Sequence, residues 1–308
     1  MADNYLRACR LTAGGKTYSL DDMQVEFLVR QKRIQTPAVA EIRIINLSGQ
    51  TKNAICVQNL PVTLEAGYQD HCGIIFKGSI KQANRGKLNG TDTYVDLFCG
   101  DGDQAYINAR VSTTLAKGSS RQDIVNACLK SFSTFGIQKG FMSAKLSDGF
   151  KSPQAIPLFG LARDIMRKTC KDVGADWSFN SEKLNVLHKA EALPGGDIVL
   201  NSQTGMVGRA TQTFNGIIVR ALINPALHKD CVVRIDESSI DRAAPDQSFG
   251  YENPSNAKLP SIAADGRYRV YGVDRTGIMR GGEWNDTLYC AAASGEGFLP
   301  KALMDFQQ

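Results

Sequence analysis

QVEFLVR, residues 24–30, sets the fold class of this chain. Val25, Phe27 and Val29 alternate with positions suited to a second face, and this period of two residues predicts a strand with one buried side. Four similar runs follow before residue 100, separated by turn-forming clusters. The strongest turn signal is Asn89-Gly90, because both residues tolerate positive φ in a two-residue hairpin. Many short strands at regular spacing predict a sandwich or barrel over residues 1–112.

The pattern changes near Gly118, where apolar residues begin to recur at helical spacing. Ser120 and Asp123 have the spacing of a capping box, so a helix is predicted to begin there. A strand pair around the polar turn at 180–183 closes this part of the chain. The sequence therefore predicts a small α+β insert over residues 113–195.

A second helix of this insert is predicted from about Leu158 to Val173. Its polar side contains Asp164 and Lys168, which we expect to form an i,i+4 ion pair. Gly174 is expected to take the left-handed conformation that ends many helices.

Strand periodicity resumes near Asp197 and continues through the third region, predicted as a second barrel over residues 196–308. Its long polar segment, 236–266, has little periodicity, and a connection of that length is usually disordered or functional. TYVDLFCGDGD (93–103) and RYRVYGVDRTG (267–277) share a pattern of an amphipathic strand that runs into a Gly/Asp turn. This repetition suggests two similar barrels, one at each end of the chain.

The composition excludes several classes. The chain has 308 residues, of which 43% are hydrophobic and 22% charged, as in ordinary globular proteins. No apolar run approaches the roughly 18 residues that span a bilayer, so no transmembrane segment is predicted. The N-terminus lacks the apolar stretch of a signal peptide. Eight scattered cysteines without metal or redox spacing are expected to be reduced.

Catalytic and metal-binding patterns are weak. GGKT at 14–17 resembles the end of a phosphate-binding loop, but Arg10 stands where the earlier glycine belongs, so we expect a hairpin turn. Asp70-His71-Cys72 is interpreted as a turn rather than a metal site, because neighbours on a strand point to opposite faces. His188 has no nucleophile arranged with it by sequence. We therefore predict no catalytic residues, no metal site and no cofactor.

Two basic clusters bear on nucleic-acid binding. The first, at 30–33, either contacts an acidic partner or discourages edge pairing of a strand. The second, at 163–171, alternates with Asp164 and Asp172 as on a solvated helix face. No aromatic residues interleave with these charges as a stacking platform requires. With a formal net charge of only +5, stable nucleic-acid binding is not expected.

An ordered series of segments carries a resemblance to a known family. They are AEIRIINLSGQT (40–51), VTLEAGYQDHCGIIFKGSI (62–80), TYVDLFCGDGDQA (93–105), GSSRQDIVNACL (118–129), GLARDIMRKTCKDVGADWSFNSEKLNVL (160–187), MVGRATQTFNGIIVRALINPALHKDCVVRID (206–236) and GRYRVYGVDRTGIMRGGEWNDTLYC (266–290). In this order they resemble the first barrel, the insert and the second barrel of bacteriophage baseplate hub proteins. One departure is His228-Lys229-Asp230, which occupies a turn where the family pattern leads us to expect glycine.

The resemblance implies a mainly β fold, with two tail-tube-like β-barrel domains flanking a small helix-helix-hairpin region. It implies a non-enzymatic virion protein, assembled in the bacterial cytoplasm, in the baseplate of a tail that we expect to be contractile. Such a hub is a homotrimer whose six similar domains match the hexameric tail tube on one side and a trimeric central spike on the other. Its channel passes DNA during genome ejection, so lysines and arginines are expected mostly to avoid the lumen.

On this hypothesis, loops provide the contacts with neighbouring subunits or other baseplate proteins. The candidate interface residues are Asn224, Pro225, Asp236, Ser248, Tyr251, Asn253 and Lys258. Deletion of 248–258 is expected to leave the monomer folded and to reduce assembly. Two alternatives remain: a β-rich module that binds nucleic acid or another phage protein, and, less favoured, a tail-associated hydrolase.

Overall fold

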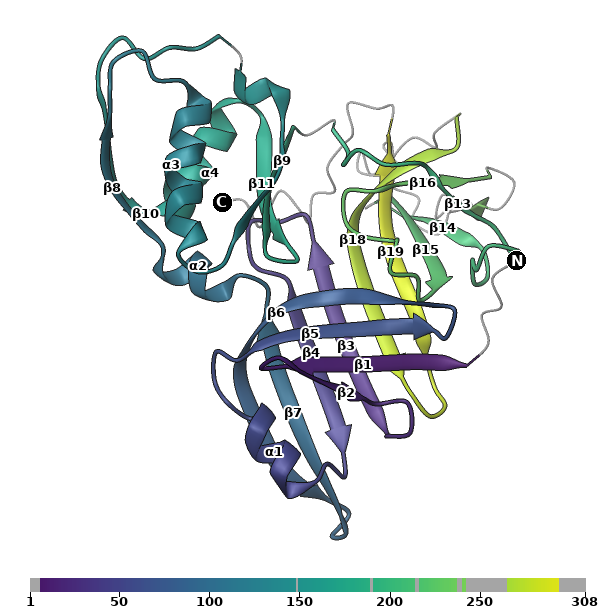
Figure 1. Ribbon diagram of the computed structural model, residues 1–308. Helices are drawn as coiled ribbons and strands as arrows, with labels where there is room; N and C mark the ends of the chain where they lie inside the picture. Colours follow the sequence, from purple (N-terminus) through teal and green to yellow (C-terminus); the bar gives the residue numbers. More distant parts are fainter. Residues whose placement is uncertain are drawn as a thin grey trace, which may run out of the picture.

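The alternation in the segment 24–30 is that of a strand. In β3 (Val25–Lys32), Val25, Phe27, Val29 and Gln31 are buried, whereas the residues between them face outward. The computed structural model describes residues 6–147, 149–188, 191–213, 216–236, 240–241 and 265–293. Figure 1 shows two β regions and, beside them, a helical insert.

The elements follow one another in three groups. The N-terminal β region contains β1 (Arg7–Ala13), β2 (Lys16–Ser19), β3, β4 (Val39–Ile45), α1 (Gly49–Ile55), β5 (Pro61–Tyr68), β6 (His71–Leu88), β7 (Asp92–Gly100) and α2 (Asp103–Asn108). The insert contains β8 (Arg110–Leu115), α3 (Arg121–Ser133), β9 (Gln138–Met142), the 3-10 turn η1 (Ala144–Ser147), β10 (Ile156–Leu161), α4 (Ala162–Asp172), β11 (Ala175–Asn180) and β12 (Lys183–His188). The C-terminal β region contains β13 (Ile198–Leu200), β14 (Ala210–Thr213), β15 (Gly216–Leu222), β16 (Val232–Ile235), β17 (Ile240–Asp241), β18 (Arg267–Ile278) and β19 (Trp284–Ala292).

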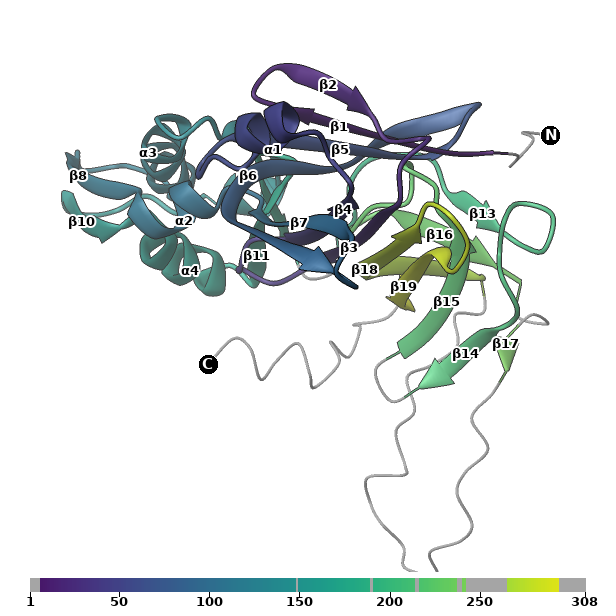
Figure 2. The same ribbon diagram turned by 90° about the horizontal axis from the view of Figure 1, so that it is seen from below.

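One sheet runs through both β regions. Its described strands are ordered β17-β14-β15-β19-β18-β3-β4-β7-β6-β5-β1-β2, and β13 and β16 join it beside β18. The connection between the regions is the antiparallel pairing of β3 with β18, in which Glu26 to Lys32 lie opposite Ile278 to Gly272. The predicted mainly β class is therefore confirmed, and the two β regions share backbone hydrogen bonds. Figure 2 shows β3 and β18 side by side.

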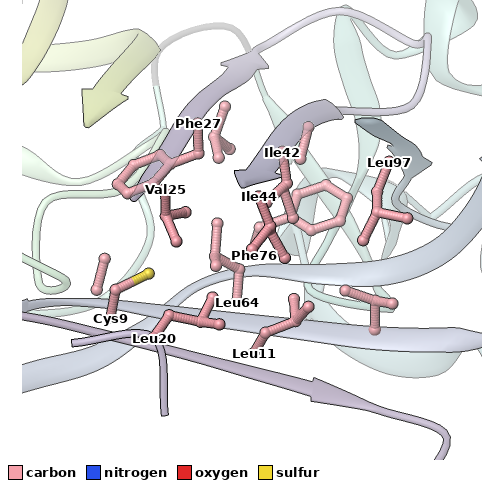
Figure 3. Packing of buried hydrophobic residues seen from close by; sticks show 14 of the residues in the cluster. Cys9, Leu11, Leu20, Val25, Phe27, Ile42, Ile44, Leu64, Phe76 and Leu97 are labelled. Carbon is pink, nitrogen blue, oxygen red and sulfur yellow. The ribbon is translucent and has the colours of Figure 1, made fainter. Parts of the chain in front are cut away.

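The apolar core of the N-terminal region forms between its strands. Figure 3 shows Cys9 and Leu11 of β1 and Leu64 of β5 on one side, with residues of β3, β4 and β7 facing them. Trp284 of the C-terminal region is also part of this cluster and lies 5.3 Å, centroid to centroid, from the ring of Phe27. A separate cluster fills the insert and another fills the C-terminal region. The domain limits 1–112, 113–195 and 196–308 stay predictions.

The insert begins as the sequence predicts. The Ser120 side chain accepts a hydrogen bond from the backbone N–H of Asp123, whose carboxylate accepts one from the Ser120 N–H at 2.7 Å. Helix α3 then buries Val125, Cys128 and Phe132. The capping box and the inward face are both confirmed.

The second helix differs from its prediction at its start. Residues 156–161 form β10, which pairs with β8, and α4 begins only at Ala162. Residues 156–161 are extended rather than helical because Pro157 has no backbone N–H to donate and Gly160 has a φ of +129°, outside the helical range. The predicted ion pair of Asp164 with Lys168 is also wrong, since Asp164 pairs with Arg167 at 3.3 Å instead. Gly174, with φ of +65°, ends the helix as predicted.

The predicted turns have the expected backbone. Asn89 and Gly90 both have positive φ between β6 and β7, and Gly14 and Gly15 join β1 to β2. At the turn-forming cluster around Ser48, a short helix replaces the predicted turn. Ser48 caps this helix, α1, by accepting a hydrogen bond from Thr51 N–H. The N-terminal region is therefore not purely β.

Candidate assembly surfaces

The basic cluster at 30–33 does not lie wholly on the surface. Arg33 has a side chain only 2% exposed and pairs with Asp230 of the C-terminal region at 3.3 Å. Its Nε lies 3.7 Å from Asp176 of the insert. The guanidinium also donates hydrogen bonds to backbone carbonyls of the insert and the segment after it, at Leu187, His188 and Glu191. Arg33 therefore joins all three parts of the chain.

A second buried cation lies in the same junction. Lys229 is 1% exposed, and its Nζ donates to the carbonyl of Phe179 at 2.5 Å. Burial lowers the pKa of Lys229, against the attraction of Asp230 and Asp101. The Asp101 carboxylate accepts the backbone N–H groups of Ser181 and Glu182 in the β11–β12 turn, at 2.7 and 2.8 Å. Burial raises the pKa of Asp101 to about 6.

This junction explains the unexpected turn at 228–230. Asp230 has a φ of +70°, the conformation for which glycine is expected, and aspartate is among the few other residues that tolerate it. A glycine there could not provide the carboxylate that faces Arg33. The charged residues Lys229 and Asp230 were missed as buried groups from the sequence. The sequence signal that could have indicated their burial was the presence of two charged residues in a turn where glycine is expected.

The predicted Asn224-Pro225 connection lies against the chain's own elements. The backbone N–H of Asn224 donates to Asp286 at 3.2 Å, and its carbonyl accepts from Arg275 at 3.3 Å. A side chain added at Gly73 of β6 would meet Pro225 at 2.9 Å, so the two β regions touch here. Both predicted residues are half-buried within one subunit.

The other predicted interface residues are less informative. Asp236 is exposed at the end of β16. Ser248, Tyr251, Asn253 and Lys258 lie outside the described residues, as does most of the segment 236–266. Of the predicted interface residues, the structure therefore places only Asn224, Pro225 and Asp236.

A broad exposed face, absent from the sequence prediction, lies on the shared sheet. We call it the outward face: the side chains of β15, β19, β18, β3, β4 and β7 that point away from the buried clusters. Its strands are aligned in register across the junction of the β regions, so Thr276, Leu28, Glu41 and Phe98 form one row. A parallel row contains Ile278, Glu26, Arg43 and Asp96. Residues of both rows line a shallow groove.

The outward face carries paired charges. Arg43 donates two hydrogen bonds to Asp96, at 2.7 and 2.9 Å, and its guanidinium lies 5.1 Å from the centre of the Tyr94 ring. The hydrogen bond to Asp96 raises the pKa of Arg43. In the next charged row, Arg30 lies opposite Asp274. Opposite charges therefore alternate across neighbouring strands.

The described part of the chain offers no cluster of three or more histidine, cysteine or acidic side chains that could hold a metal ion. Its helices include none that is long and apolar enough to cross a membrane. Asp70 lies in the two-residue turn between β5 and β6, as predicted, whereas His71 and Cys72, predicted to lie in the same turn, are the first residues of β6.

Comparisons with solved structures reveal a shared fold across nearly the whole chain. A 43 kDa tail protein of prophage MuSo2 from Shewanella oneidensis matches with a TM-score of 0.61 at 8% identity, over 96% of this chain and 99% of that one. A tail protein from Neisseria meningitidis matches with a TM-score of 0.57 at 9% identity, over 93% and 96% of the two chains. No family model matches the chain, and no curated protein does.

A third similar structure comes from a secretion system. It is an Escherichia coli component of the type VI secretion system, described as structurally similar to the bacteriophage T4 tail proteins gp27 and gp5. The TM-score is 0.55 at 10% identity, over 94% of this chain and 79% of that one. This chain therefore shares its fold with these phage tail proteins and with this secretion-system component, which confirms the fold expected from the resemblance.

Proposed function

We propose that this chain is a structural hub of a phage tail baseplate, without enzymatic activity, that assembles as a homotrimeric ring. The ring joins a hexameric tail tube to a trimeric central spike and leaves a channel for the genome. The continuous sheet across the two β regions is the observation that carries the proposal. Three copies with two β regions each provide six similar units. Because β3 pairs with β18, the two β regions of each chain form one continuous segment of the ring wall.

The buried junction supports this assignment. Arg33, Lys229 and Asp230 tie the β regions and the insert together away from water. Breaking such a pair leaves a buried charge uncompensated, which is costly, so the three parts keep one relative arrangement. A rigid unit is what a ring that must match two different neighbours requires.

The outward face suits the wall of the channel. It is a long surface that both β regions share through β3 and β18. In the proposed ring it faces the lumen, and the insert lies on the outside. The segment 236–266 and the Asn224-Pro225 connection then serve contacts with a neighbouring subunit, the tube or other baseplate proteins, in a tail that we take to be contractile.

The oligomeric state tests the proposal. Light scattering behind gel filtration is expected to give three times the 33.5 kDa chain mass. Deletion of 248–258 should keep the circular dichroism spectrum and melting temperature of the parent while reducing the trimer fraction. A stable dimer would overturn the ring, because two-fold symmetry cannot arrange two β regions per chain as six matching units.

A further inference from the structure

We infer that an open cavity where the three parts of the chain meet binds an acidic segment of a partner protein. The cavity has a volume of about 410 Å³, a size at which proteins bind ligands. We call it the junction cavity, and its lining includes Gln31, Ile74, Lys139, Lys183, Pro225 and Arg275. All of its lining residues belong to one chain, so the inference goes beyond the proposed ring and does not depend on it.

The unpaired charges of the junction cavity are basic. Lys139 of β9 and Lys183 of β12 line it and are exposed, and neither pairs with an acid among the described residues. Glu182, next to Lys183 in the chain, is already paired with Lys77 at 2.7 Å. Arg275 is the third cation of the lining, which contains no described aspartate or glutamate. Two lysine charges without an acidic partner attract a ligand that carries carboxylates.

Two buried polar side chains of the lining have hydrogen-bonding atoms that no described residue uses. Gln31 is 4% exposed and donates from Nε2 to the carbonyl of Ile75 at 3.0 Å, but its Oε1 accepts no hydrogen bond from the described part of the chain. Arg275 is 1% exposed, with Nη1 3.5 Å from Asp286, and its Nε has no acceptor there either. Buried polar groups in native proteins are nearly always paired, because an unpaired one is costly. One unused acceptor and one unused donor suit a peptide group, which has both an N–H and a C=O.

The remaining wall of the junction cavity is apolar and partly open to water. Ile74 is 49% exposed, whereas the next residue, Ile75, is buried. Pro225, predicted from the sequence as an interface residue, is half-buried in the same wall. The other apolar lining residues are Phe141, Leu193 and Pro194. Because covering these side chains removes apolar surface from water, an occupant with an apolar side chain beside its carboxylate uses both the wall and the lysines.

Contacts within the chain hold the lining in place. The Asn185 side chain accepts a hydrogen bond from the backbone N–H of Phe141 at 2.8 Å and so joins β12 to β9. A Cβ at Gly140 would collide with the same Asn185 oxygen, so a larger residue there would displace it. Nδ1 of His228, another lining residue, donates to the Lys229 carbonyl at 2.9 Å and orients the ring. A site formed before binding loses less entropy when it is occupied.

Selection of peptides by the full chain tests the inference without assuming which protein is the partner. We expect the peptides enriched from a library of short random sequences to carry aspartate or glutamate next to an apolar residue. A selected peptide made with amides in place of its carboxylates should bind about tenfold more weakly in fluorescence anisotropy, with a smaller difference at high salt. Selected peptides without an excess of acidic residues would overturn the inference.

Ile74→Glu tests whether the selected peptide binds in the junction cavity. This change adds a carboxylate to the wall at a position that is 49% exposed, so it should weaken binding more than about tenfold by charge repulsion and leave the fold intact. The matched control is Ile107→Glu in α2, the same change at 48% exposure outside the cavity, which should bind as the parent does. Circular dichroism checks the fold of both variants. Equal binding by the two would refute the site.

Lys139→Gln with Lys183→Gln tests the charge separately. Loss of these two exposed cations should weaken binding about fivefold. Lys87→Gln with Lys117→Gln makes the same charge change at exposed positions outside the cavity and should leave binding unchanged. Equal affinities of the two double variants would contradict the role of the lysines.

Competition with N-acetylglutamate distinguishes a protein segment from a small free acid. If this acid displaces the selected peptide at equal concentration, the cavity takes a small carboxylate and the partner segment is refuted. Displacement only at a large excess supports the segment, because the apolar wall and the peptide groups then contribute to binding. Since the cavity lies within one chain, a dimer in light scattering would refute the ring and leave this test unaffected.

Discussion

Ion pairs occur in two contrasting places in this molecule. In the junction, Arg33 and Asp230 are side chains 2% and 0% exposed, 3.3 Å apart. On the outward face, Arg43 and Asp96 form a shorter contact, 2.7 Å, with side chains 44% and 17% exposed. The better geometry is thus at the more exposed pair.

The contrast teaches that a short contact distance does not show which of the two pairs contributes more to stability. Water screens the Arg43 pair and solvates either partner alone, so its contribution to stability is small. At the junction neither carboxylate oxygen of Asp230 accepts a hydrogen bond from any described residue, yet loss of Arg33 would strand that charge in the interior. The buried pair joins the two β regions in the interior, and the exposed pair contributes to the charge of a surface.

The largest effect is expected from Arg33→Met. It removes the ion-pair partner of the buried Asp176 and Asp230, so the free energy of unfolding should fall by about 3–5 kcal/mol in urea denaturation. The matched control is Arg30→Met in the same basic cluster, which is exposed and should change stability by less than about 1 kcal/mol. Adding Asp230→Asn to Arg33→Met should restore part of the loss, since asparagine tolerates positive φ. Equal stability of the two single variants would contradict the buried network.

The next effect is a dependence on pH. Burial raises the pKa of Asp286 from 3.8 to about 6, although Arg275 opposes this. The folded state therefore prefers the protonated carboxyl, and the associated stability is present at low pH and is lost as the pH rises through 6. Relative to Asp286→Asn, the parent should gain up to about 3 kcal/mol between pH 7 and pH 4.

Parallel urea titrations of the two proteins across this range measure the difference. Asp172→Asn, an exposed change of the same kind, controls for the loss of one carboxyl. A gap between the parent and Asp286→Asn that stays constant with pH would show that Asp286 is ionised throughout.

A smaller effect is expected where the insert meets the N-terminal region. Asp101→Ala removes the acceptor of the Ser181 and Glu182 amides, and an unpaired buried group costs about 1–3 kcal/mol. Hydrogen exchange at these two amides should accelerate. Lys77→Ala, which breaks only the partly exposed contact of Lys77 with Glu182, should leave their exchange unchanged. Unaltered exchange in Asp101→Ala would mean that the turn is held by other contacts.

The smallest effect is expected on the outward face. Arg43→Gln should lower the free energy of unfolding by less than about 1 kcal/mol, because the pair is screened by water. Thermal and urea denaturation together check this value. A loss above 2 kcal/mol would give the exposed pair a structural role like that of Arg33 and remove the contrast between the two sites.

The sequence predicts the local elements well and the junction poorly. Strand alternation, the Ser120 capping box and the Asn89-Gly90 turn depend on neighbours in the chain, so their patterns are visible in it. Pairing of β3 with β18 joins segments from opposite ends of the chain, and alternation alone does not specify a partner. Arg33 has the pattern of a surface charge, and only the distant Asp176 and Asp230 make it a buried one.

The β3–β18 pairing also sets an order of events during synthesis. Residues 25–32 leave the ribosome well before their partners at 272–278 have been made. Until β18 has been made, β3 therefore has an open edge, the kind of surface through which unfinished chains associate wrongly. A chain that stops before Arg267 never closes that edge. Completion of the sheet thus distinguishes chains that contain β18 from chains truncated before it.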